Sequence, residues 1–406
     1  MSRFLRELTA GSPRTEGVFA IQHLRRALDA GVITADEQVP STNLQPASLD
    51  LRLGSEALRL RCSFLPNSYP VAERAQELVD GDPIDLTGEG ALLDKGRPYL
   101  IRLQERLALP DDVRARANPK SSTGRADVFT RVITNAGHSF DDIRPGYHGD
   151  LWLEVVPLSF PVRVREGLSL NQLRLSTGST RLSDLEVAAM HRDVPLLYRG
   201  GGVVNDKHFT VSNGLFLGLN LKGDRSGFVG YVARATAPNL DLRQVGGAEV
   251  EVYWERVTKE PKDQIVLEPR RFYLLMSDEA VAIPSHCAAE MTAYDPTSGE
   301  LRTHYAGFFD PGFGYGRKGE IEGSTAALEV RAHDVPFLIE HRQRVCKLTF
   351  EFMLDEPETV YGEAISSNYQ QQTSTLGKHF QRSSPLSSPK KRLPSDDAPQ
   401  LFAPKT

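Results

Sequence analysis

The sequence predicts a mainly β protein that consists of two tandem distorted β-barrel units, jelly-roll-like in topology, with a short N-terminal helix. Three observations lead to this fold class. Short apolar runs are separated by Gly, Pro and Asp, no helix–strand alternation of the βαβ kind occurs, and the second half of the chain repeats motifs of the first. The 406 residues are enough for two or three domains with large cores.

The N-terminal elements are predicted from their periodicity. Residues Val18 to Ala30 place their apolar side chains on one helical face, and Gly31 follows as a plausible C-cap. Residues 46–54 then alternate strictly, which predicts a half-buried strand whose apolar face carries Leu49, Leu51 and Leu53.

Further strands are expected over Tyr99–Leu103, Leu151–Val156 and Leu168–Leu175. Residues 176–207 differ from this pattern and are interpreted as a connector. It contains a possible short helix with Ser183 as its N-cap, followed later by three consecutive glycines.

Five motifs recur in the same order after the connector. The paired positions lie 164 to 175 residues apart, and these pairs are Ser48 and Ser212, Tyr99 and Tyr273, Pro110 and Pro284, Pro145 and Pro311, and Glu154 and Glu329. Such a series predicts two copies of one β unit, over residues 1–175 and 208–360. Beyond them, residues 361–380 are polar, and the tail at 381–406 is expected to be disordered because it is almost devoid of apolar residues.

Composition and charge exclude several classes of function. A net charge of −5 argues against a general nucleic-acid binder, and no apolar run approaches the roughly 18 residues of a membrane span. The N-terminus lacks the apolar core of a signal peptide, and three widely spaced cysteines fit a reducing environment, so a cytoplasmic location is expected. The Cys-x-x-Cys pair of zinc-dependent base deaminases is absent, and no zinc is expected.

The stretch from Lys120 to Arg125 has the residue types of an oxyanion site. Two cations flank three hydroxyl side chains and a glycine, which are Lys120, Ser121, Ser122, Thr123, Gly124 and Arg125. A guanidinium with neighbouring hydroxyls can hold phosphate, and glycine lets the backbone approach a ligand closely. A polar surface turn is the alternative interpretation.

Two glutamates lie inside apolar strands. Glu154 and Glu329 are each flanked by Leu and Val, so strand alternation places each carboxylate on the face opposite its neighbours. That face is either exposed to solvent or lines a pocket, where desolvation would suit a carboxylate to general acid/base chemistry.

Four motifs together resemble the dCTP deaminase family. Residues 45–54 look like its opening strand, Lys120–Arg125 like its Arg-Ser-Ser-x-x-Arg motif, and the Pro145–Gly149 turn with Leu153–Glu154 like its catalytic-glutamate strand. Residues Tyr369–Gln372 are similar to the C-terminal lid that the family shares with trimeric dUTPases, so 361–380 is expected to act as a lid.

The resemblance implies a dUTPase-like barrel, a homo-oligomer with sites between subunits, and a deoxynucleoside triphosphate substrate accompanied by Mg²⁺. The implied reaction converts dCTP and water to dUTP and ammonia without zinc. Two alternatives stay open: a dUTP diphosphatase or bifunctional enzyme, and a non-catalytic deoxynucleotide-binding protein. Neither nucleic acid nor a membrane is an expected partner.

Neither copy carries the complete motif set. Arg144 replaces the Asp that the family has before Pro-Gly in the first copy, whereas in the second copy Asp310 restores it but the Ser-Ser motif has decayed over Asp295–Arg302. We therefore predict one composite site. Its catalytic residues would be Ser121, Ser122, Arg125 and Glu329, and its nucleotide-binding residues Lys120, Thr123, Gly124, Asp310, Gly312, Phe313, Tyr369 and Gln371. The alternative is a self-contained site in the first copy that uses Glu154.

Overall fold

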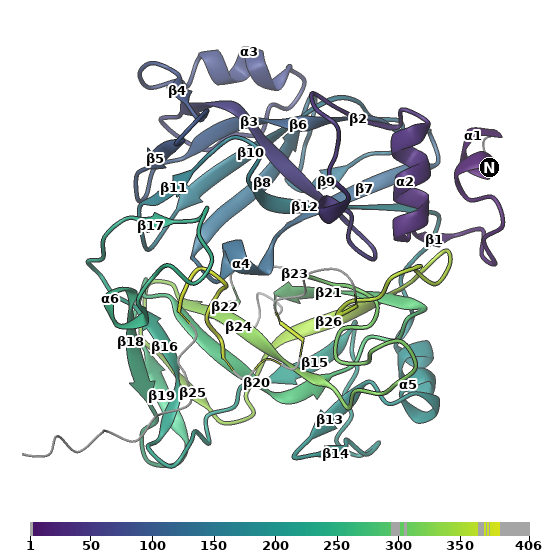
Figure 1. The fold of residues 1–406 in the computed structure, drawn as a ribbon. Helices are drawn as coiled ribbons and strands as arrows, with labels where there is room; N and C mark the ends of the chain where they lie inside the picture. Colours follow the sequence, from purple (N-terminus) through teal and green to yellow (C-terminus); the bar gives the residue numbers. More distant parts are fainter. Residues whose placement is uncertain are drawn as a thin grey trace, which may run out of the picture.

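A computed structural model of the chain describes residues 3–293, 301–303, 307–363, 369–370, 372 and 374–381. The strands form two β units that lie one above the other, and the short helix α4 lies at the junction between them (Figure 1). The fold is mainly β, as predicted. Within the described residues no helix is long and apolar enough to cross a membrane.

The first unit is built around one large sheet in the order β8-β10-β6-β3-β12-β7-β9, with β1, β2 and β4 at its margins. All pairings within that sheet are antiparallel. The strands of the first unit are β1 Gly17–Val18, β2 Ile33–Ala35, β3 Leu49–Arg59, β4 Ile84–Asp85, β5 Ala91–Leu93, β6 Tyr99–Ala108, β7 Val113–Pro119, β8 Val128–Thr134, β9 Asp142–Ile143, β10 His148–Pro157, β11 Val162–Val164 and β12 Ser169–Thr177. Strands β5 and β11 pair with each other outside the large sheet.

The second unit has a sheet in the order β14-β13-β20-β16-β18, to which β24 and β22 add, and a second sheet in the order β15-β26-β21-β23. Its strands are β13 Leu197–Arg199, β14 Gly202–Val203, β15 Leu215–Gly218, β16 Phe228–Ala233, β17 Leu240–Asp241, β18 Trp254–Thr258, β19 Gln264–Leu267, β20 Tyr273–Val281, β21 Cys287–Ala293, β22 Leu301–Thr303, β23 Gly307–Phe309, β24 Ser324–Ala332, β25 Phe337–Glu340 and β26 Arg344–Phe352. Strand β17 pairs in parallel with β11 of the first unit.

The same strand register occurs in both units. In the first, β6 and β10 pair Tyr99 with Val155 and Leu100 with Glu154. In the second, β20 and β24 pair Tyr273 with Val330 and Leu274 with Glu329. Each tyrosine hydroxyl also accepts a hydrogen bond from the backbone N–H five residues before it, at 2.9 and 3.0 Å. The two glutamates therefore occupy equivalent places in their sheets.

The helices are short and lie at the edges of the sheets. The first predicted helix is α2, which begins at Ile21 rather than Val18 because Gly17–Val18 pairs with β12 as β1. Ser183 is the N-cap of α5, as predicted, and forms a capping box with Glu186. The helices are α1 Arg3–Leu8, α2 Ile21–Asp29, the 3₁₀ turn η1 Ser41–Asn43, α3 Val71–Gln76, α4 Ser121–Gly124, α5 Asp184–Asp193 and α6 Val250–Tyr253. The predicted connector thus contains α5, β13 and β14, and β13 pairs with β20.

Strand β3 departs from the half-buried strand that its alternation predicts. Its leucine face packs in the core of the first unit, but Asp50 and Arg52 on the other face are each only 4% exposed. Arg52 forms a buried ion pair with Glu105, with 2.7 Å between Nε and Oε1. Asp50 instead faces a cavity between the units. The polar face of β3 is therefore buried, because Arg52 is paired with Glu105 and Asp50 forms part of the cavity wall.

Candidate active site

A cavity of about 320 Å³ lies where the two units meet. The first unit supplies the loop before β3, the segment from the end of β7 through α4, and the start of β12. The second unit supplies β21, β23, β24 and the turn after β23, and the C-terminal segment completes the wall. Figure 1 shows α4 between the two units at this place.

The Lys120–Arg125 motif forms the wall on the first unit. Pro119 ends β7, Lys120 is the N-cap of α4, and Arg125 is its C-cap. This single helical turn brings five of the predicted residues into the cavity wall, namely Lys120, Ser121, Ser122, Gly124 and Arg125. Thr123, which was predicted to bind the nucleotide, is 1% exposed and is not part of the wall.

Glu329 comes from the second unit and meets this motif at Gly124. Its neighbours Leu328 and Val330 pack in the core of the second unit, so Glu329 faces the cavity. A methyl group placed on Gly124 would lie 2.7 Å from Oε2 and 2.8 Å from Oε1 of Glu329. Burial raises the pKa of this carboxyl to about 8; the nearby Arg125 opposes the shift and Asp127 adds to it.

Glu154 has a different environment from its counterpart. It is fully buried and is absent from the cavity wall. Arg131 donates to Oε1 of Glu154 from both Nε, at 3.1 Å, and Nη2, at 2.5 Å. Apolar side chains that include Leu100 and Ile133 form a separate small cluster beside this strand, with Trp152 packed against it. A self-contained first-unit site around Glu154 is therefore not accessible to a ligand in this structure.

Arg125 is held by the C-terminal segment. Its guanidinium lies 3.8 Å from the centre of the Tyr369 ring, and its Nη1 donates to the carbonyl of Thr375 at 3.4 Å. Tyr369, Gln372 and Lys378 all line the cavity. Gln371, which was predicted to bind the nucleotide, is outside the described residues, as is most of the decayed motif at 295–300.

Asp310 is the second carboxylate of the second-unit wall. It follows β23, is 7% exposed, and accepts a hydrogen bond at 3.2 Å from Nη2 of Arg174, a β12 residue. Burial raises the pKa of Asp310 to about 6, against the effect of Arg174. Phe313 lines the cavity, whereas Gly312 lies behind it in a turn with φ of +94°, a conformation that favours glycine.

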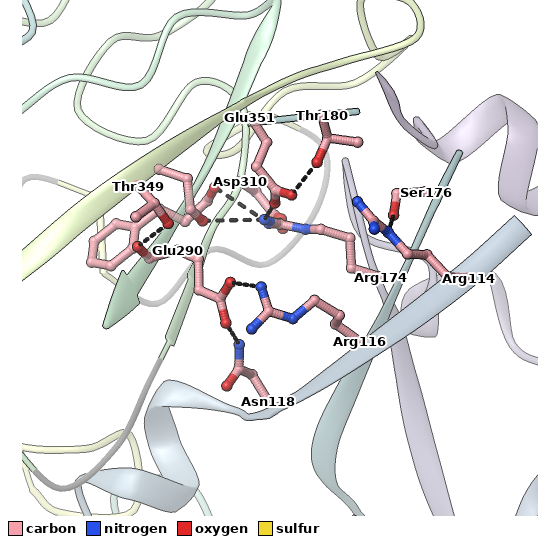
Figure 2. A network of polar contacts seen from close by, with 12 residues as sticks. Arg114, Arg116, Asn118, Arg174, Ser176, Thr180, Glu290, Asp310, Thr349 and Glu351 are labelled. Carbon is pink, nitrogen blue, oxygen red and sulfur yellow. Dashed lines mark hydrogen bonds and ion pairs between the residues drawn. The ribbon is translucent and has the colours of Figure 1, made fainter. Parts of the chain in front are cut away.

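Figure 2 shows that Arg174 belongs to a polar network across the junction of the units. Besides Asp310, Arg174 contacts Glu351 at 3.3 Å, and Arg116 contacts Glu290 at 2.7 Å. Asn118 donates to the other oxygen of Glu290 at 2.9 Å. Cations of β7 and β12 thus meet carboxylates of β21, β26 and the turn after β23, which fixes the position of Asp310.

At another part of the wall Lys120 forms an ion pair with Asp50, and Lys378 lies nearby. Burial and the charge of Lys120 lower the pKa of Lys378, and burial raises that of Asp50. Asp50, Lys378 and Tyr361 also line the cavity, although the sequence predicted no individual role for them within residues 45–54 and 361–380. Further wall residues that were not predicted include Thr42, Asn43, Gln45, Ser169, Gln172, Met291, Phe308, Phe309 and Gln372.

The described residues contain no group of three or more His, Cys, Asp or Glu side chains that could hold a metal ion. One buried carboxylate oxygen in the wall has no hydrogen-bond partner, namely Asp50 Oδ1. A single such oxygen fits Mg²⁺ that arrives with a triphosphate, because Mg²⁺ keeps several waters and takes most of its other ligands from phosphate.

The C-terminal segment gives a prediction by truncation. Phe380 packs at 5.5 Å from Trp254, and Gln381 N–H donates to the carbonyl of Ala248 at 2.8 Å, so the segment is anchored at its end. We expect truncation after Gln381 to leave nucleotide turnover intact, whereas truncation after Tyr361 removes Tyr369 and Lys378 and abolishes it. Steady-state turnover of the two truncated proteins is the measurement, and equal behaviour would contradict a lid at 361–380.

Comparison with known proteins agrees with this architecture. Residues 15–179 match the family model of the 2'-deoxycytidine 5'-triphosphate deaminase N-terminal domain, and residues 183–380 match that of the C-terminal domain. A dCTP deaminase of Haloarcula marismortui is 33% identical over 37% of this chain and 74% of its own length. A dUMP-forming dCTP deaminase of Clavibacter michiganensis is 34% identical over 36% of this chain and 69% of its own length.

A solved structure extends the match to most of the chain. The crystal structure of 2'-deoxycytidine 5'-triphosphate deaminase from Agrobacterium tumefaciens superposes with a TM-score of 0.78 and 41% identity, over 85% of this chain and 100% of that one. With both family models matched in order and the cavity formed between them, the chain belongs to the dCTP deaminase family.

Proposed function

We propose that the protein deaminates dCTP to dUTP and ammonia in the cavity between its two units. The observation that carries the proposal is the close approach of the Glu329 carboxylate to Gly124, because it places a half-buried acid/base group against the Lys-Ser-Ser-x-x-Arg segment. A carboxyl with a pKa of about 8 can both accept and return a proton near neutral pH.

The charges of the wall suggest how the nucleotide lies. Lys120 forms an ion pair with Asp50, and Lys378 also interacts with Asp50, whereas Arg125 interacts with Glu329. The triphosphate would lie at the two lysines and the cytosine at Glu329. Asp310, which interacts with both Asp50 and Tyr361, would face the sugar between them.

The proposed reaction is an addition followed by an elimination. Glu329, once ionised, takes a proton from water as the water oxygen bonds to C4 of cytosine, and it passes that proton to N3. Glu329 then takes the proton of the new C4 hydroxyl and delivers it to the amino group, so that the tetrahedral carbon loses ammonia as the C4 carbonyl forms. Ser121 or Ser122 would hold the water, and Arg125 would stabilise the charged states.

Mg²⁺ would neutralise part of the triphosphate charge. Asp50 Oδ1 is the wall oxygen that would hold it or one of its waters. The other contacts would come from side chains of the cavity wall. Lys120 and Lys378 would bind phosphate oxygens, and Tyr369 and Gln372 would cover the bound nucleotide. A homo-oligomer is expected from the family, and the wall residues named above all come from the chain itself.

The test is an assay of the purified protein with dCTP and Mg²⁺ after exhaustive zinc chelation. We expect ammonia release at an undiminished rate, because the proposed proton transfers use Glu329 rather than a zinc-bound water. Absence of ammonia release, or release that only added zinc restores, would contradict the proposal. Tight dCTP binding in calorimetry without turnover would instead support a non-catalytic nucleotide-binding protein.

A bifunctional reaction is the second candidate, and it is favoured by relatives whose names describe dUMP-forming dCTP deaminases. Asp310 would then direct water at a phosphate. The products of the same assay separate the two: ammonia with dUTP indicates a deaminase alone, whereas dUMP with pyrophosphate indicates the bifunctional route.

A further inference from the structure

A buried ion pair joins the two units directly beside Glu329. Asp127, which follows α4, is fully buried and has a left-handed backbone with φ of +54°. Its Oδ2 accepts hydrogen bonds at 2.5 Å from both Ser159 Oγ and Arg331 Nη2. Arg331 lies on β24 two residues after Glu329, on the same face of the strand. The pair therefore bridges the motif segment and the glutamate strand.

Both partners of this ion pair are fixed by the backbone around them. Asp127 N–H donates to the carbonyl of Gly124 at 2.8 Å, and the Asp127 carbonyl accepts from Leu158 N–H at 2.9 Å. On the other side, Arg331 Nη1 donates to the carbonyl of Arg270 at 2.7 Å. A planar guanidinium held at two points leaves little freedom, so the ion pair sets the spacing between α4 and β24.

We propose that Asp127 is a positioning residue that, through Arg331, holds the strand of Glu329 against α4 and so places the carboxylate for the reaction. The inference rests on the function proposed for Glu329. Asp127 differs from a residue that only stabilises the fold, because its charge also acts on Glu329.

The charge effect follows from the groups around Glu329. Arg125 favours its ionised form and Asp127 disfavours it, next to the larger effect of burial. Arg331 stands on the same strand, and Asp310, Tyr361 and Tyr369 share the cavity wall. Replacing Asp127 by a neutral residue removes an anion that raises the pKa of Glu329, and it leaves the Arg331 cation without this partner. Loss of the Asp127 charge lowers the pKa of Glu329.

The experiment uses Asp127→Asn, because Asn tolerates a positive φ and keeps the size of the side chain. We expect kcat/KM for dCTP to fall by about tenfold or more at its optimum, since small misplacements of a catalytic group are costly. We also expect the acidic limb of the kcat/KM profile to move to lower pH. A purely structural role would lower the rate at every pH and leave the limb in place.

Two further variants sharpen the test. Arg331→Lys keeps the charge but cannot bridge Asp127 and the Arg270 carbonyl as a fork, so we expect a lower kcat with an unmoved limb. Glu290→Gln is the matched control, because it removes another carboxylate that pairs across the junction, at Arg116 (Figure 2). Glu290→Gln is expected to leave the acidic limb of the kcat/KM profile at the same pH as in the wild type. A wild-type rate in Arg331→Lys would overturn the positioning role.

A readout without turnover keeps this inference separate from the proposed function. The ¹³C carboxyl resonance of Glu329, assigned by its loss in Glu329→Gln, is expected to titrate near pH 8 and at lower pH in Asp127→Asn. A shifted titration without ammonia release would refute the proposed reaction, and with it the positioning role, but not the electrostatic coupling. Ammonia release with an unmoved titration and an unmoved limb would refute the inference alone.

Discussion

Replacing Glu329 by Gln is expected to lower kcat for dCTP deamination at least about a hundredfold, the usual scale for losing a general acid/base group. The neutral amide cannot take the proton from water, while its size preserves the contact with Gly124. Glu154→Gln is the matched comparison, since both glutamates occupy the same register of equivalent strands. It is expected to cost far less activity, because Glu154 is buried against Arg131 outside the cavity.

The two variants are expected to change the thermal stability in opposite directions. Glu154→Gln weakens a buried ion pair and leaves Arg131 with a neutral partner, so its thermal midpoint falls. Glu329 has a raised pKa, so the folded state binds a proton more tightly than the unfolded state, and this group lowers stability as pH rises from about 4.5 to about 8. Glu329→Gln therefore melts higher than the wild type at pH 8. A dead Glu154→Gln with a near-normal Glu329→Gln would refute the composite site.

Gly124→Ala is expected to be the second most damaging change. The added methyl group would lie 2.7–2.9 Å from the carboxylate of Glu329, closer than van der Waals contact allows. Because a carboxylate at the end of a flexible side chain can move aside, the fold survives but the catalytic group is displaced. A displacement of this size is expected to lower kcat/KM about a hundredfold.

Gly202→Ala is the control for Gly124→Ala. Gly202 also has no positive φ, and nothing lies within 4 Å of an added methyl group there. Kinetic constants and the thermal midpoint are measured for both variants. The steric account of Gly124 predicts a normal midpoint with a low kcat/KM, whereas a wild-type kcat/KM in Gly124→Ala would contradict it.

The fold class could be predicted from the sequence because its evidence is local or repeated. Alternation along a strand, the Ser183 cap and the recurring motif pairs each depend on a few neighbouring residues. The burial of Asp50 could not be predicted in this way. Its side chain lies on the face that alternation assigns to solvent, but it pairs with Lys120 in the wall of the cavity that the two units enclose.

The residues of the candidate site could likewise be predicted only in part. Lys120, Arg125 and Glu329 could be named from their motifs, and the structure brings them to one wall. Lys378 could not be predicted from the sequence, because its proposed role depends on its proximity to Lys120, which lies 258 residues earlier in the chain. Thr123 shows the converse, since membership of a motif does not tell which side of a helical turn a residue occupies.

The ion pair that covers Glu154 has a consequence for stoichiometry. Because Arg131 closes off one of the two equivalent glutamates, the composite site that we propose would occur once in each 406-residue chain. We therefore expect saturation at one nucleotide per chain. Under this proposal the two barrels need not keep the same residues. The first unit would supply the residues that hold phosphate, and the second would supply the glutamate for proton transfer.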